Sequence, residues 1–138
     1  MANPSEILPR LCLIEDDEIM GESLNQRFTL EGFEVDWWRN ARDASTALEN
    51  RRYQVIVSDI RLPDRNGSDL FLDLVTRLPR LPPFLFMTGY GSIDRAVELL
   101  KAGAADYITK PFDADALVAK VRGLAQGYGA LGSNDGDA

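Results

Sequence analysis

The stretch Val55–Gly67, VIVSDIRLPDRNG, places a carboxylate directly after a run of apolar residues. Its first three residues are all β-branched, and an unbroken apolar run of this kind predicts a strand that is covered on both faces. Asp59 stands where that strand should end, and a loop containing proline and glycine follows it. The stretch therefore predicts a buried strand that carries one acidic side chain at its end.

Around this stretch, short apolar runs alternate with amphipathic segments. The predicted strands are Leu11–Ile14, Phe33–Trp38, Val55–Asp59, Phe84–Thr88 and Asp106–Thr109. Strands that alternate with helices predict an α/β fold with a doubly wound, five-stranded parallel sheet. The first, third and fourth runs are the most continuously apolar and the other two are mixed, which suits central and edge strands respectively. This ranking agrees with the strand order 2-1-3-4-5.

The segments between these runs carry apolar residues at helical spacing. Asn40 and Asp113 are the expected N-caps of two helices, and Gly32 and Gly103 the expected ends of two others. The expected apolar stripes are Met20, Leu24 and Phe28; Ala44, Ala47 and Leu48; Leu70, Phe71, Leu74, Val75 and Leu78; Ile93, Ala96, Val97 and Leu100; and Leu117, Val121 and Leu124. We expect residues 1–9 to be a tail, 10–126 one domain, and 127–138 a Gly-rich linker or disordered tail.

The composition narrows the classes of function. The 138 residues carry a net charge of −7, which would repel phosphate backbones and argues against direct nucleic-acid binding. No stretch is long and apolar enough to predict a membrane span, and the single cysteine, Cys12, fits a cytoplasmic protein. The chain has no histidine, which excludes a Ser-His-Asp site and a histidine-ligated metal.

Polar side chains follow four of the five predicted strands. They are Glu15, Asp16 and Asp17 after the first, Asp59 at the end of the third, Thr88 at the end of the fourth, and Lys110 with Pro111 after the fifth. Parallel strands all end at one edge of the sheet, where α/β proteins bind ligands. Because neighbouring strands lie about 4.8 Å apart, the acids of the first and third strands should meet.

Such a cluster predicts a cation. Two carboxylates about 4 Å apart repel by about 4 kcal/mol at an effective dielectric constant of 20, and hard oxygen ligands with this charge suit Mg²⁺. Each residue taken singly also has a structural explanation. Asp59 would cap the next segment, the three acids would open a solvated helix, Thr88 would be a strand or turn residue, and Lys110 would lie on the surface. Their joint placement favours a phosphoryl-binding pocket.

Four motifs in this order resemble the receiver domain of two-component response regulators, the CheY-like family. They are LIEDDE (Leu13–Glu18), SDIRLPDRNG (Ser58–Gly67), MTGYGS (Met87–Ser92) and DYITKPF (Asp106–Phe112). The family has the flavodoxin-like fold with the strand order given above. The resemblance spans residues of about 10 to 126, nearly the whole chain.

The resemblance implies a role for each of these residues. Asp59 is similar to the phospho-acceptor, and Glu15 and Asp16 to the acidic pair that holds Mg²⁺ together with the backbone carbonyl of Arg61; Asp17 is a lesser contributor. Lys110 is similar to the lysine that pairs with the phosphoryl group, and the Lys110–Pro111 peptide bond to the cis bond of the family. Thr88 and Tyr107 match the switch hydroxyl and the switch aromatic residue.

The implied function is signalling rather than metabolic catalysis. A sensor histidine kinase would donate a phosphoryl group to Asp59, in a transfer that the receiver itself catalyses, as it does its own dephosphorylation. The fourth helix, fifth strand and fifth helix would then present a changed face to a homodimer partner or effector. Residues 87–112 resemble receivers of NtrC-type transcriptional activators, whose ATPase and DNA-binding domains are not in this chain. The chain is then a fragment of a longer regulator, or else a stand-alone receiver.

Three rival interpretations fit less well. A hydrolase of the haloacid-dehalogenase type needs a second Asp two residues after its nucleophile, where this chain has Arg61. A flavodoxin-like cofactor binder needs a phosphate loop after the first strand, where this chain has acids. A pseudo-receiver that signals by binding alone would not need the full set of Asp59, Thr88 and Lys110.

Overall fold

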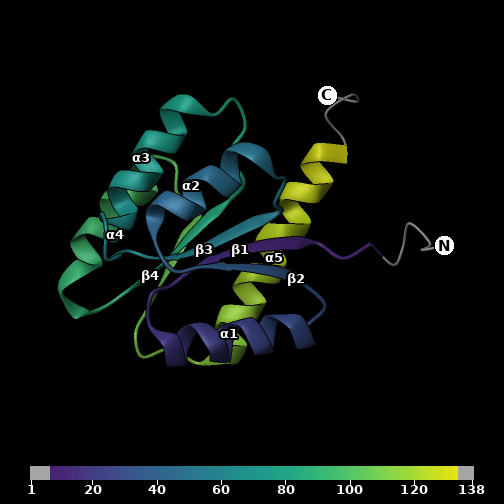
Figure 1. Ribbon diagram of the computed structural model, residues 1–138, viewed down its shortest axis with the longest axis horizontal. Helices are drawn as coiled ribbons and strands as arrows, with labels where there is room; N and C mark the ends of the chain where they lie inside the picture. The colour runs from purple at the N-terminus through teal and green to yellow at the C-terminus, as the bar shows by residue number, and fades with distance from the viewer. Residues whose placement is uncertain (1–6, 134–138) are drawn as a thin grey trace.

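The computed structural model describes residues 7–133, with the backbone alone for Tyr90 and for residues 128–133. Five strands alternate with five α-helices along the chain (Figure 1). The elements are β1 (Arg10–Ile14), α1 (Glu18–Leu30), β2 (Glu34–Trp38), α2 (Ala41–Asn50), β3 (Val55–Asp59), α3 (Gly67–Arg77), β4 (Phe84–Thr88), the short 3₁₀ helix η2 (Tyr90–Ser92), α4 (Ile93–Lys101), β5 (Asp106–Thr109) and α5 (Ala114–Ser133).

The sheet is parallel throughout and has the strand order β2-β1-β3-β4-β5, which confirms the predicted fold and order. In its register, Ile14 lies opposite Ser58 of β3 and Asp59 opposite Met87 of β4. The strands therefore end nearly level with one another. This places the residues that follow β1, β3, β4 and β5 at one edge.

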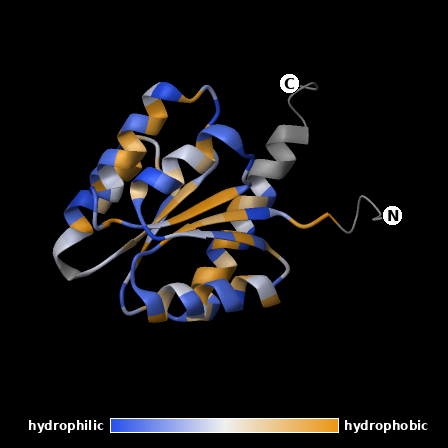
Figure 2. Ribbon diagram, viewed as in Figure 1, coloured by the Kyte–Doolittle hydropathy of each residue, from blue (hydrophilic) through white to orange (hydrophobic). Residues whose placement is uncertain are grey.

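Two hydrophobic cores cover the two faces of the sheet. Figure 1 shows α1 and α5 on one face and α2, α3 and α4 on the other. Successive residues of a strand point to opposite faces, so Leu11 and Leu13 pack on the α1–α5 side and Cys12 and Ile14 on the other. Figure 2 shows the central strands as the most hydrophobic part of the molecule. This burial accounts for the continuously apolar runs of β1, β3 and β4.

Glycine ends α1 as the sequence predicts. Gly32 has a φ of +97°, which glycine adopts without the strain that a side chain would cause. Its N–H donates to the carbonyl of Thr29 (3.1 Å), and the N–H of Phe33 donates to that of Phe28 (3.0 Å). The rings of Phe28 and Phe33 meet edge to face, 5.9 Å apart. These contacts form a Schellman motif, which satisfies the last helical carbonyls and turns the chain into β2.

The predicted stripes of α3 and α4 are partly wrong. Val75 is 42% exposed, and Ile93 and Val97 are each 38% exposed. In α4 the buried residues are Ala96 and Leu99. Because α4 covers the sheet near β4 and β5 only, a narrow line of its surface is buried and the rest of the apolar stripe faces outward.

The C-terminal helix is longer than predicted. α5 begins at Ala114, after Asp113, whose carboxylate accepts the N–H of Asp115 (3.1 Å) as an N-cap should. The helix continues to Ser133, so residues 127–133 are helical, which the Gly-rich sequence did not predict; residues 1–6 and 134–138 lie outside the described part. Among the described residues, no helix has the length and hydropathy that crossing a bilayer requires.

Candidate metal and phosphoryl site

Three carboxylates meet at the ends of β1 and β3. Glu15, Asp16 and Asp59 each place one oxygen within 4.8 Å of the others. Glu15 is fully buried, Asp59 has a side chain that is 14% exposed, and Asp16 faces solvent. The sheet brings these residues together because β1 and β3 are hydrogen-bonded neighbours. The expected meeting of the acids is therefore seen in the structure.

Lys110 reaches the same cluster from the end of β5. Its Nζ donates to Oδ2 of Asp59 at 2.7 Å and to Oε1 of Glu15 at 3.4 Å. Its backbone N–H donates to the carbonyl of Thr88 (2.7 Å), and the Lys110–Pro111 peptide bond is cis, as expected. One ammonium group thus bridges acids from two strands across the sheet edge.

The charges of this cluster do not balance. Burial raises the pKa of Glu15 to about 7, and the negative charge of Asp59 adds to the rise, against a hydrogen bond from the N–H of Asp17 and the charge of Lys110. Burial lowers the pKa of Lys110, but its hydrogen bond with Asp59 and the charges of Asp59 and Glu15 raise it more, so the net shift is upward. Three acids with one lysine leave the site two negative charges in excess when all are ionised.

This donor set fits Mg²⁺. The cluster offers carboxylate oxygens alone, close enough together for one ion to contact several of them, and hard divalent cations prefer such ligands. Burial first, and then the negative charge of Asp59, raises the pKa of Glu15, and a bound cation would offset both by favouring its ionised form. The acids are therefore suited to a small, hard cation.

The turn after Asp59 is tightly built. The N–H of Arg61 donates to Oδ1 of Asp59 (3.1 Å), so the backbone of Arg61 lies beside the acidic residue. Gly67 returns against the end of β3, and a Cβ there would lie 2.4 Å from the carbonyl oxygen of Asp59. No ordinary Cβ contact is that short, so glycine allows α3 to start directly beside the acidic residue.

Two of the acids near the pocket have structural partners. Asp17 is the N-cap of α1 and accepts the N–H of Met20 (2.8 Å), so its carboxylate is used by the helix. Asp64, which no sequence pattern singled out, accepts the N–H groups of Ala41 and Arg42, both at 2.9 Å. Asp64 thereby ties the loop after Asp59 to the start of α2. The local sequence around Asp64 could not predict this role, because the hydrogen-bond partner Ala41 lies 23 residues away along the chain.

The two expected switch residues lie on β4 and β5. Thr88 is fully buried, and its hydroxyl donates to the carbonyl of Gly89 (3.2 Å). Tyr107 is half-buried and packs against the core on the α2–α3–α4 side. Phe86 of β4 pairs with Tyr107, so the two switch residues lie on adjacent strands.

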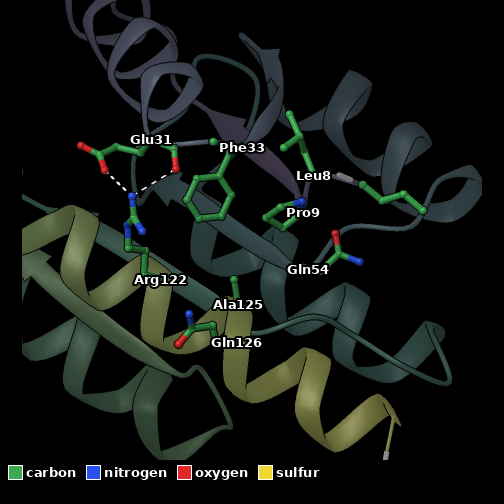
Figure 3. A pocket seen from close by; sticks show the side chains of 10 residues that line it. Leu8, Pro9, Glu31, Phe33, Gln54, Arg122, Ala125 and Gln126 are labelled. Carbon is green, nitrogen blue, oxygen red and sulfur yellow. Dashed lines mark hydrogen bonds and ion pairs between the residues drawn. The ribbon is translucent and has the colours of Figure 1, made fainter. Parts of the chain in front are cut away.

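A cavity of about 480 Å³ lies at the opposite end of the sheet (Figure 3). Its walls include Leu8, Pro9, Phe33 and Ala125. The one charged pair drawn there is Arg122 with Glu31, in which the guanidinium also donates to the backbone carbonyl of Glu31 at 3.1 Å. The lining also includes the polar side chains of Gln54 and Gln126, and the carboxylate of Glu31 has a guanidinium partner there.

The fold is that of a receiver domain. Residues 11–122 match the family model of the response regulator receiver domain, and the chain belongs to this family. It is 38% identical over 127 residues to the response regulator protein FleR of Pseudomonas aeruginosa, covering 92% of this chain and 27% of that protein. It is also 38% identical to the C4-dicarboxylate transport transcriptional regulatory protein DctD of Rhizobium meliloti, covering 83% of this chain and 25% of DctD.

Solved structures show the same fold. The signal receiver domain of a putative Luxo repressor protein from Vibrio parahaemolyticus superposes with a TM-score of 0.83 at 30% identity, covering 90% of this chain and 95% of that one. Full-length FixJ from B. japonicum gives a TM-score of 0.83 at 30% identity, covering 93% of this chain and 63% of FixJ. This chain spans only about a quarter of the length of FleR and DctD.

Proposed function

We propose that Asp59 accepts a phosphoryl group from the phosphohistidine of a sensor histidine kinase, in a reaction that the domain itself catalyses in the cytoplasm. The observation that carries this proposal is the position of Asp59, which ends a rigid buried strand within 2.7 Å of the Lys110 ammonium. An oxygen of Asp59 forms the new P–O bond while the P–N bond of the donor breaks and the leaving imidazole takes up a proton. The missing histidine of this chain is thus supplied by the donor.

The chain's own groups position the reaction and balance its charge. Lys110 neutralises oxygens of the transferring phosphoryl group, and the N–H of Arg61 holds the Asp59 carboxylate in orientation. Glu15, Asp16, Asp59 and the carbonyl of Arg61 would hold Mg²⁺. When bound, Mg²⁺ supplies positive charge that stabilises the transferring oxygens.

The proposed response to phosphorylation begins at Thr88. A phosphorylated Asp59 carries a charge of about −2 and strong acceptor oxygens, to which the Thr88 hydroxyl would turn from its present partner, the carbonyl of Gly89. Tyr107 then turns inward into the vacated space. These side-chain movements would alter the α4–β5–α5 face. Ile93 and Val97 of α4 are partly exposed and could contact a homodimer partner or effector.

The output is proposed to be transcriptional. DctD is by name a transcriptional regulatory protein and is about four times longer than the stretch matched here. The receiver would then act on an attached output domain, an ATPase with a DNA-binding domain as in NtrC-type activators. In that arrangement, residues 10–126 form the receiver and the end of α5 leads to the output domain.

Incubation with Mg²⁺ and acetyl phosphate tests the proposal. We expect intact-mass analysis to show one added phosphoryl group on the wild-type chain and none on Asp59→Asn. Glu34→Gln, which removes an exposed carboxylate at the other end of the sheet, is the matched control and should be phosphorylated normally. An unchanged mass of the wild-type chain, or phosphorylation of Asp59→Asn at the wild-type rate, would contradict the assignment.

A further inference from the structure

The backbone of Glu15 is held by two residues of the edge strand β2. Its N–H donates to the carbonyl of Trp38 at 3.0 Å, which continues the ladder between β1 and β2 by one bond. β2 ends at Trp38, so the strand provides no further backbone donor for the Glu15 carbonyl. The indole Nε1 of Trp37 donates to that carbonyl at 2.8 Å. A side chain thus takes the place of the missing strand partner.

The indole of Trp37 reaches Glu15 by packing against α1 at a position that has no side chain, Gly21. Gly21 is buried in α1, and a Cβ built on it would lie 2.0 Å from Cζ2 and 2.7 Å from Nε1 of Trp37. Contacts this short do not occur, so any side chain at position 21 would displace the N–H end of the indole. A glycine inside a helix normally weakens it, and here its absence of a side chain serves the packing of Trp37.

A cation–π contact also holds the ring of Trp37. The guanidinium carbon of Arg39 lies 4.1 Å from the ring centroid of Trp37, within the range of such an interaction. Arg39 is itself paired with Glu18 at the start of α1, with an N–O distance of 2.9 Å. The indole is therefore fixed between a helix and a paired arginine, with its N–H directed at Glu15.

We propose that Trp37 is a positioning residue of the acidic site, which holds Glu15 in place for the divalent cation through the bond from its indole N–H to the Glu15 carbonyl, in the space that Gly21 leaves open. The inference rests on the proposed function, because it takes Glu15 as a cation ligand. Trp37 contacts neither the cation nor the phosphoryl group. It acts on the backbone of a residue whose carboxylate is fully buried and also contacts Lys110.

Loss of the indole N–H should weaken cation binding. Removing a residue that hydrogen-bonds to a metal ligand and orients it typically lowers metal affinity or activity by 10- to 100-fold. Because the bond of Trp37 acts on the backbone and not on the carboxylate, we expect an effect at the lower end, about tenfold in the Kd for Mg²⁺.

The adjacent tryptophan provides a matched control. Trp37→Phe keeps an aromatic ring but removes the donor, and Trp38→Phe makes the same chemical change one residue along. The Nε1 of Trp38 is buried and makes no hydrogen bond of ordinary geometry among the described residues, and the substitution keeps the Trp38 carbonyl that accepts the Glu15 N–H. Titration calorimetry with Mg²⁺ should therefore show a Kd about tenfold higher for Trp37→Phe and within about twofold of the wild type for Trp38→Phe.

Each single-tryptophan variant also gives a spectroscopic signal. The remaining Trp37 of the Trp38→Phe variant should change its fluorescence when Mg²⁺ binds, since its N–H contacts the backbone of a ligand. The remaining Trp38 of the Trp37→Phe variant should respond little at saturating Mg²⁺. At saturating Mg²⁺ the phosphorylation rate of Trp37→Phe with acetyl phosphate should return toward that of the wild type, because the change lies in affinity.

A second variant tests the packing independently. Gly21→Ala would ordinarily favour the helix, but here we expect it to displace the indole and raise the Kd for Mg²⁺ by a similar factor. In a Trp37→Leu background, where the indole is absent, Gly21→Ala should cause no further rise. The two positions would then show strong energetic coupling.

The outcomes separate this inference from the proposed function. Equal Mg²⁺ affinities of Trp37→Phe and Trp38→Phe, or Gly21→Ala effects that are the same with and without Trp37, would overturn the role of Trp37 while phosphorylation of Asp59 stood. A wild-type chain that binds Mg²⁺ with this dependence on Trp37 but takes no phosphoryl group would sustain the inference and overturn the proposed acceptor. A wild-type chain that binds no Mg²⁺ would overturn the inference.

Discussion

The two ends of the sheet differ in how their charges are balanced. At the carboxyl ends of the strands, Glu15 and Asp59 share the ammonium of Lys110, and Asp16 lies beside them. At the other end, beside the cavity of Figure 3, Glu31 is paired with both Arg27 and Arg122. Three acids meet one ammonium at the first end, whereas one acid meets two guanidinium groups at the second.

This difference shows why chemistry, rather than cavity size, locates the functional site. Burial raises the pKa of Glu15, whereas hydrogen bonds from Arg122 and then Arg27 lower that of Glu31. A raised pKa means that burial disfavours the ionised acid more than the nearby positive charge favours it. Perturbed groups of this kind gather at functional sites. The predictions below test this contrast.

The largest effect should come from removing the ammonium group that contacts Glu15 and Asp59. Lys110→Met keeps about the length of the side chain but removes its charge. The oxygens of the phosphoryl group then lose their ammonium partner during transfer. We expect phosphorylation by acetyl phosphate to slow by about 10²-fold, which is typical of enzymes that lose one hydrogen-bond donor to the transition state. Time-resolved intact-mass measurement checks this. Arg122→Gln at the other end is the control, and an equal loss of rate in both variants would refute the contrast.

A smaller effect should appear in the pH dependence of stability without Mg²⁺. The pKa of Glu15 is about 7 in the fold and has a usual value of 4.5, so its protonated form favours folding below about pH 4.5. This contribution is lost as the pH rises through about 7. Thermal melts in a chelator should show that decline for the wild type and a flatter profile for Glu15→Gln.

The same melts with Mg²⁺ added should reverse the decline. At a concentration ten times its Kd, a cation that binds only the folded state stabilises it by about 1.4 kcal/mol, or a few degrees in Tm. Na⁺ at matched ionic strength should have much less effect. A Tm that does not respond to millimolar Mg²⁺ at pH 8 would argue against a cation site at this end.

The smallest effect should come from the balanced end. Glu31→Gln weakens ion pairs with Arg27 and Arg122, whose side chains are 33% and 49% exposed. Exposed pairs contribute little because water already solvates their charges. We expect a Tm lower by a few degrees at most, with Mg²⁺ affinity and phosphorylation unchanged. A change in Mg²⁺ affinity would show that the two ends are coupled.

Local patterns predicted most of the fold. Continuous apolar runs indicated the buried strands because a strand covered on both faces has no polar side. The predictions failed where burial depends on what lies opposite, as for Val75, Ile93 and Val97, which are apolar but partly exposed. The end of α5 was also missed, since glycines in the sequence suggested a break and the helix nevertheless continues to Ser133.

By itself, the sequence determined the alternation of strands and helices and the edge at which Glu15, Asp16, Asp59 and Lys110 gather, because parallel strands all end on one side. The strand order agreed with the apolar ranking of the runs and was implied by the family resemblance. Only the tertiary structure decided the partners of single side chains, such as the bonds of Asp64 to α2 and of Trp37 to Glu15. Those contacts join residues 22 or more positions apart, and their geometry depends on side-chain packing. Periodicity specifies the face on which a residue lies, and packing alone selects the atom that it meets.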